Sequence, residues 1–216
     1  MELITWFIDF ILHLDKHLTE LVADYHLWVY AILFLIIFCE TGLVVTPILP
    51  GDSLLFAVGA LAAVDQTGTL NVTYVWVLLT VAAILGNEVN FRIGRAVGPR
   101  AFSGGLRWMK QDYLVRTQQF YEKHGGKTII LSRFIPIIRT FAPFVAGVGQ
   151  MQRRRFAAYN VGGGFAWVTL FVWGGYVFGN VPIIKENFGI VTIGIVVVSV
   201  LPVVWGLLSK PRQPAV

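Results

Sequence analysis

The chain has 216 residues, of which 56% are hydrophobic and only 13% are charged, against about 25% charged residues in soluble domains. With a mean hydropathy of +0.70, this composition excludes an ordinary soluble domain and predicts one integral membrane domain over residues 1–216. The formal net charge of +5 does not indicate a nucleic-acid partner, because the basic residues cluster in loops between apolar runs rather than along one polar face.

Residues 1–24 are predicted to form an amphipathic helix that lies in the membrane interface or packs upright against the bundle. His13 and His17 have the spacing of metal ligands on a helix, with Asp9 one turn away. A polar stripe explains the same residues without further ligands, so we expect no metal site and no cofactor.

Residues 21–39 are long enough to span the membrane, and this predicted span ends at Glu40. The apolar run over residues 54–64 is too short to cross, because a helix needs about 20 apolar residues for roughly 30 Å of hydrocarbon. We therefore predict a re-entrant hairpin over residues 40–64, which carries Glu40 and Asp52.

Three residues favour a break in this hairpin. Pro47 and Pro50 lack backbone N–H donors, and the Pro50-Gly51 pair favours a tight turn, so the two arms are expected to fold back on each other. Irregular backbone at membrane depth is tolerated only where it is buried in protein or lines a polar cavity, which is also where charged side chains belong.

The loop at residues 65–71 contains no Lys or Arg, and a second span is predicted over residues 73–91. The stretch from 92 to 127 is the most basic part of the chain and is expected to be a cytoplasmic loop. The end of the span mixes small residues with candidate supporting polar residues, namely Asn87, Glu88, Asn90 and Arg95. Glu88 and Arg92, one turn apart, could form an ion pair.

A second re-entrant hairpin is predicted over residues 128–149, where Pro136 separates Arg133 from Arg139. On an unbroken helix these two arginines would point about 120° apart, and Pro136 permits another geometry. Further spans are predicted over residues 156–178 and 188–208. Several glycines are expected to let helices approach closely: Gly86, Gly94, Gly98, Gly162, Gly163, Gly164, Gly174, Gly175 and Gly179.

The charge of the loops predicts the orientation. Three consecutive arginines, Arg153 to Arg155, follow the second hairpin, and Lys210 and Arg212 follow the last span, so these ends and the C-terminus are expected in the cytoplasm. The two hairpins then enter from opposite faces, as in transporters built from inverted repeats with a site near the membrane midplane. The expected fold is an all-α helical bundle with two oppositely oriented re-entrant hairpins.

Four ionisable residues in apolar surroundings form the candidate site. Glu40 and Asp52 could bind a proton, a cation or the two arginines, while Arg133 and Arg139 present the fork-shaped donors that suit phosphate or carboxylate. Ionisable groups at membrane depth cost several kcal/mol unless paired or hydrated, which marks them as functional by default. The alternatives are anchors at the headgroup boundary and a static network that only holds the hairpins together.

An enzyme is not expected. Ser132 lies beside Arg133, but the nearby His124 belongs to the basic loop, so no base accompanies the hydroxyl. The sequence also lacks a Gly-x-Ser-x-Gly elbow, a His-Glu-x-x-His pair and a phosphate-binding Gly-Lys-Ser/Thr loop.

Four motifs together are similar to those of the DedA family of bacterial membrane proteins. They are Glu40 with the following Pro47-to-Asp52 segment, the run RFIPIIR from Arg133 to Arg139, the segment GNEVNFRIGR from Gly86 to Arg95, and Trp167 with Gly175-Tyr176. The resemblance covers nearly the whole chain. It implies two opposed re-entrant hairpins, and Glu40, Asp52, Arg133 and Arg139 match the charged positions that the family needs for activity.

The resemblance also implies a function: recycling of undecaprenyl phosphate across the bacterial cytoplasmic (inner) membrane, coupled to protons. From the residues and the resemblance together we expect a multi-pass transporter whose arginines bind the phosphate headgroup and whose carboxylates handle protons. Its partners would be the polyprenyl phosphate, protons and membrane lipids, with no nucleic acid, and the sequence is compatible with a homodimer. Two alternatives stay open, a proton-coupled exporter of a small ion or drug and a membrane scaffold that transports nothing.

Overall fold

The computed structural model describes residues 27–43, 51–65, 68–100, 126–179 and 181. Within these residues the fold is all-α, as predicted, and contains no strand. The helices are α3 (Trp28–Gly42), α4 (Gly51–Val64), α5 (Val72–Arg100), α7 (Lys127–Ser132), α8 (Pro136–Val148) and α9 (Arg153–Gly179). Several predictions lie outside the described residues: the helix over 1–24 with its histidines, Pro47 and Pro50, and the span over 188–208.

Among the described residues, two helices are long and apolar enough to cross a membrane. One candidate span, Val72–Gly98, lies within α5, and the other, Arg153–Gly179, is the whole of α9. The 29 residues of α5 extend about 43 Å at the α-helical rise, which exceeds the roughly 30 Å of a hydrocarbon core. Both helices therefore have room to continue into the headgroup layer.

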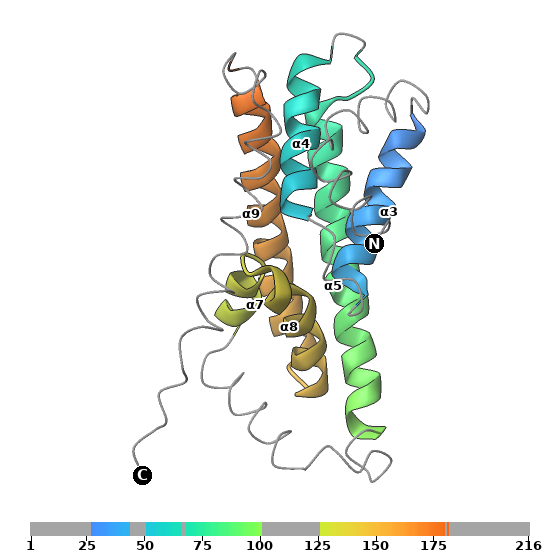
Figure 1. Ribbon diagram of the computed structural model, residues 1–216. Coiled ribbons are helices and arrows are strands. Elements are labelled where there is room, and N and C mark those ends of the chain that lie inside the picture. The colour runs from blue at the N-terminus through green and yellow to red at the C-terminus, as the bar shows by residue number, and fades with distance from the viewer. Residues whose placement is uncertain (1–26, 44–50, 66–67, 101–125, 180, 182–216) are drawn as a thin grey trace, which may run out of the picture.

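The predicted span over residues 21–39 lies partly outside the described residues, and the other described helices have at most 15 residues. The longest of them, α3, has 15 residues and extends only about 22 Å. In Figure 1, α3 and α4 lie in the upper part of the molecule, and α7 and α8 lie in the lower part. The end of α3 and the starts of α4 and α8 meet near mid-height, which is where the charged side chains come together.

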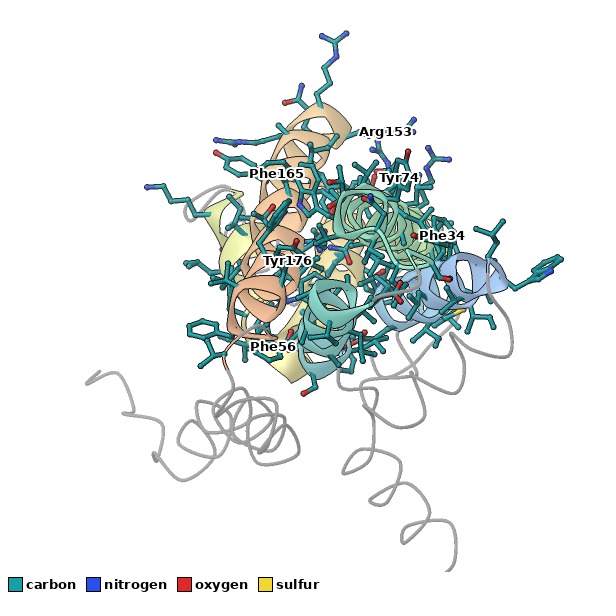
Figure 2. The ribbon with its side chains drawn as sticks, turned by 90° about the horizontal axis from the view of Figure 1, so that it is seen from above. Phe34, Phe56, Tyr74, Arg153, Phe165 and Tyr176 are labelled. Carbon is teal, nitrogen blue, oxygen red and sulfur yellow. The ribbon has the colours of Figure 1, made fainter. Side chains whose placement is uncertain are left out.

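The packing divides the short helices between the two long ones. Helices α3 and α8 pack on α5, whereas α4 and α7 pack on α9, and α5 and α9 also contact each other. Each half of the chain, α3–α5 or α7–α9, thus sends its second short helix across to the long helix of the other half. This exchange locks the two halves into one bundle, which Figure 2 shows from above.

Glycine allows the closest of these contacts. A Cβ on Gly59 of α4 would collide with the backbone of Val172 in α9, and one on Gly175 of α9 would collide with the backbone of Phe56 in α4. The contact between α5 and α8 has the same character at Gly94 and Gly147. Backbones that approach this closely gain van der Waals contact, which is the main driving force for helix association in lipid.

Two predicted boundaries differ from the structure. Helix α5 does not end at residue 91 but continues to Arg100, so residues 92–100 of the predicted loop are helical. Its charged continuation is supported by the Glu88–Arg92 pair, one turn apart. Helix α3 runs on to Gly42, so Glu40 lies in its last turn rather than after it.

Candidate functional site

Arg139 lies at the centre of a buried charge cluster. It belongs to the first turn of α8, which begins at Pro136 because Ile135 before it is extended, the conformation that a following proline favours. The Arg139 side chain is buried, and its Nη1 donates to Asp52 Oδ1 at 2.7 Å. Its Nη2 donates to Glu40 Oε1. The structure thus joins three of the four candidate residues, from three helices.

The two carboxylates come from neighbouring helix ends. Glu40 lies in the last turn of α3 and Asp52 in the first turn of α4, and both are buried. The backbone N–H of Gly51 donates to Glu40 Oε1 at 3.3 Å. A Cβ on Gly51 would lie 2.7 Å from the carboxylate carbon of Glu40, so a side chain here would displace this carboxylate from its present position. Gly51, predicted from its turn chemistry, is therefore needed for close approach to Glu40.

Trp167 of α9 completes the cluster. Its Nε1 donates to the same Asp52 Oδ1 at 2.8 Å, and the Cζ of Arg139 lies 5.2 Å from the centroid of its ring. The sequence pointed to Trp167 only as part of the family motif, not as a residue of the charged site. The available signal was weak: an indole N–H at membrane depth needs a hydrogen-bond acceptor, but the sequence does not say which one.

Arg133 occupies a separate position. It follows the last residue of α7, is buried, and donates from Nη2 to Asn160 Oδ1 at 2.5 Å. The carbonyl oxygens of Ala83 and Asn160 lie 3.4 Å from the same nitrogen. Among the described residues, its hydrogen-bond partners are all neutral oxygens, and its Nε has no partner. Of the two candidate arginines, Arg139 is therefore paired with the two candidate carboxylates, whereas Arg133 has no carboxylate partner among the described residues.

Asn160 and two glycines shape the surroundings of Arg133. Asn160 also donates from Nδ2 to the carbonyl of Ile84 at 2.9 Å, which orients its amide oxygen toward the guanidinium. A Cβ on Gly164 would lie 3.3 Å from Arg133 Nη2, and one on Gly163 would lie 3.3 Å from Arg133 Cδ. Nothing in the sequence singled out Asn160, because a lone Asn in an apolar helix is an ordinary feature.

Asn90 links the ends of two short helices to α5. Its Nδ2 donates to the carbonyl of Thr41 at 3.2 Å and to that of Thr140 at 2.7 Å. The Thr41 carbonyl lies at the end of α3, where helices leave acceptors unsatisfied. Asn90 thus holds the backbone of the residues that directly follow Glu40 and Arg139 in the chain. Asn87 is buried one turn before it.

Glu88 and Arg95 lie apart from this cluster. Glu88 Oε1 pairs with Arg92 at 2.8 Å and with Arg153 at 3.1 Å, and both arginine side chains are 59% exposed. Arg95 is exposed, and its backbone carbonyl accepts a bond from Gln150 Nε2 at 3.3 Å. The structure therefore gives these two predicted supporting residues a surface position, where Glu88 ties α5 to the start of α9.

Comparisons with known proteins identify relatives over most of the chain. A family model described as VTT domain matches residues 49–177. The chain is 58% identical to Protein DedA of Escherichia coli K12 over 216 residues, which is 100% of this chain and 98% of that protein. It is 34% identical to Inner membrane protein YqjA of the same strain over 182 residues, which is 84% of this chain and 81% of that protein.

A third relative, an uncharacterized membrane protein of Mycobacterium leprae, is 42% identical over 171 residues, or 77% of this chain and 74% of that protein. No solved structure matches the chain. Two of these relatives are named as membrane proteins, in accord with the membrane-capable helices α5 and α9 of the described residues. The chain therefore belongs to the DedA family of VTT-domain membrane proteins.

Proposed function

We propose that the protein is a transporter that moves the phosphate headgroup of undecaprenyl phosphate, a polyprenyl lipid carrier, between the leaflets of the bacterial cytoplasmic membrane. The lipid tail would stay in the bilayer during this step. The observation that carries the proposal is the burial of Arg133 with neutral hydrogen-bond partners only, among the described residues. A guanidinium in this state favours an anion as its partner.

The energetics of Arg133 support an anionic ligand. A charge buried without a counter-charge costs several kcal/mol, and neutral carbonyl and amide oxygens offset only part of this. A phosphate would supply both the charge and the acceptor oxygens that a planar guanidinium binds in pairs. Arg139 is already bound by Asp52 and Glu40, so it would accept the headgroup only after one carboxylate withdraws.

Protons would control that second step. A protonated carboxyl group carries no charge and competes weakly for a guanidinium, so uptake of one proton in the cluster would free part of Arg139 for the phosphate. Loss of the proton would restore the ion pair and release the headgroup. This cycle couples lipid movement to the proton gradient through Glu40 and Asp52.

The arrangement of the halves suits transport from one side to the other. We interpret residues 40–64 and 128–149 as re-entrant hairpins that enter from opposite faces, in an inverted repeat. The end of α3 and the starts of α4 and α8 supply the charge cluster, which we propose lies near the midplane. By the charge rule, we expect the end with Arg153, Arg154 and Arg155 to face the cytoplasm. We propose a multi-pass protein of the inner membrane with a cytoplasmic C-terminus.

The test is translocation of undecaprenyl phosphate in proteoliposomes that contain this protein alone, with and without a pH gradient. Wild type should transport, Arg133→Ala should lose transport, and Arg92→Ala, which removes an exposed guanidinium, should behave as wild type. A wild type no better than empty liposomes would overturn the proposal. A pH-dependent flux of a soluble substrate without the lipid would instead favour the small-ion or drug exporter, and no flux of either kind would favour the scaffold.

A further inference from the structure

The two carboxylates that bind Arg139 are held in different ways. Asp52 Oδ1 accepts hydrogen bonds from two side chains, Trp167 Nε1 at 2.8 Å and Arg139 Nη1 at 2.7 Å. Glu40 Oε1 accepts from Arg139 and, at 3.3 Å, from the backbone N–H of Gly51. Glu40 Oε2 is buried and has no hydrogen-bond partner in the described part of the chain.

This difference decides which carboxylate can take up a proton more easily. Hydrogen bonds to an ionised carboxylate stabilise the charge, and they weaken when the carboxylate is protonated. Protonation of Asp52 would weaken two bonds, the hydrogen bond from the Trp167 indole and the ion pair with Arg139. Among the described residues, Glu40 can place the proton on Oε2 without displacing a donor, and Arg139 is the only side chain whose bond to Glu40 weakens.

Among the described helices, Arg139 and Asp52 are the charged residues at Glu40. Arg139 reaches it from α8, and Asp52 of α4 shares the same guanidinium. Helix α5 presents the neutral Asn90 beside the end of α3, and Arg133, directly after α7, is bound to Asn160 instead. Glu88 of α5 is paired with the exposed Arg92 and Arg153.

We infer that Trp167 is a positioning residue that fixes Asp52 as the permanent counter-ion of Arg139 and leaves Glu40 as the carboxylate that exchanges the proton. Its indole ring also covers the guanidinium, at 5.2 Å from Cζ, so Arg139 keeps its place when Glu40 withdraws. The consequence for transport, that only the Glu40 side of Arg139 opens to the phosphate, rests on the proposed function.

The decisive variant is Trp167→Phe, which keeps an aromatic ring and removes the N–H donor. Trp76→Phe is its matched control, because Trp76 Nε1 donates at the same distance of 2.8 Å to Thr169 Oγ1, away from the cluster. The readout is infrared difference spectroscopy of the full-length protein in nanodiscs during an acid titration, where a protonated carboxyl group gives a separate carbonyl band. This readout does not require transport.

In wild type and in Trp76→Phe, we expect a carboxyl band that titrates, is lost in Glu40→Gln and is retained in Asp52→Asn. In Trp167→Phe, a second band should titrate in the same pH range and disappear in the double variant with Asp52→Asn. Loss of the wild-type band in Asp52→Asn rather than Glu40→Gln would overturn the inference, and so would a Trp167→Phe spectrum identical to wild type.

Two further points keep the test decisive. If Trp167→Phe does not fold, the comparison of Glu40→Gln with Asp52→Asn in the wild-type background still decides which carboxylate is protonated. If the bands behave as expected but proteoliposomes carry no lipid, the proposed function fails while the division of roles stands. If the lipid is transported but both carboxylates titrate together, the proposed function stands and the division of roles between Glu40 and Asp52 fails.

Discussion

At the scale of single residues, the cluster depends on Arg139, because its one guanidinium is the ion-pair partner of two buried carboxylates. Its removal leaves Glu40 and Asp52 buried with like charges close together and without a counter-ion among the described residues. A surface ion pair is a useful contrast, since water screens its charges and replaces the lost partner. Position in the molecule, rather than the number of ion pairs, therefore sets the energetic effect of losing an arginine.

We predict that Arg139→Ala lowers the free energy of unfolding by about 3–5 kcal/mol, the loss expected when one partner of a buried ion pair is removed. Arg92→Ala, which breaks an exposed pair with Glu88, should cost less than about 1 kcal/mol. Denaturant unfolding in detergent micelles measures both. Equal losses for the two variants would contradict the assignment of Arg139 as the centre of the buried cluster.

Asn160 offers a direct test of Arg133. The Asn160→Asp variant places a carboxylate where the amide oxygen now accepts the Arg133 bond at 2.5 Å. This carboxylate should occupy the guanidinium and weaken binding of a polyprenyl phosphate by about tenfold or more, which corresponds to about 1.4 kcal/mol. The Kd from native mass spectrometry measures the effect.

The control is Asn160→Ala, which also removes the bond to the Ile84 carbonyl but adds no charge. It should bind the lipid more tightly than Asn160→Asp does. If the two variants weakened binding equally, Arg133 would not be the site of the phosphate.

At the scale of helices, the glycine contacts decide how closely α4 approaches α9. Gly174 and Gly175 are neighbours in α9, yet a Cβ on Gly175 would collide with the backbone of Phe56, whereas one on Gly174 would meet nothing within 4 Å. Backbone cannot rotate out of the way as a flexible side chain can. The two positions therefore respond oppositely to the same substitution.

We predict that Gly175→Ala lowers the free energy of unfolding by about 1–3 kcal/mol through overpacking. Gly174→Ala should be neutral or stabilise the helix by up to about 1 kcal/mol, because alanine has the higher helix propensity. Thermal unfolding of the purified variants, followed by circular dichroism, distinguishes them. A similar loss in both would mean that α4 does not contact α9 at Gly175.

These examples show what the sequence could and could not predict. The cost of charge at membrane depth pointed to Glu40, Asp52 and Arg139, and the prolines indicated that their helices are broken. The separation of Arg133 from Arg139 and the roles of Asn160 and Trp167 depend on contacts between residues far apart in the chain, for which one sequence holds no signal. The sequence showed which glycines could allow close helix packing. Which of them contact the backbone of a neighbouring helix depends on how each helix is rotated about its axis.

At the scale of the whole molecule, the two halves exchange their second short helices, so neither half has a complete packing surface without the other. Helix α5 runs downward in Figure 1 and α9 runs upward, and the basic end of α9 lies at the bottom with the end of α5. If the charge rule applies, the lower end faces the cytoplasm and the turn before α5 faces outward.

This orientation predicts the reactivity of single cysteines placed at the two ends. The chain has one natural cysteine, Cys39, so Cys39→Ala provides a background without thiols. Thr73 lies in the first turn of α5 and Gln152 directly precedes α9, and both are exposed. A membrane-impermeant maleimide should label Thr73→Cys in intact spheroplasts and Gln152→Cys only after the membrane is opened.

Two results would contradict this prediction. Labelling of Gln152→Cys alone in intact spheroplasts would reverse the orientation and place the arginines outside. Labelling of both positions before opening would mean that α5 and α9 do not cross the membrane as full spans.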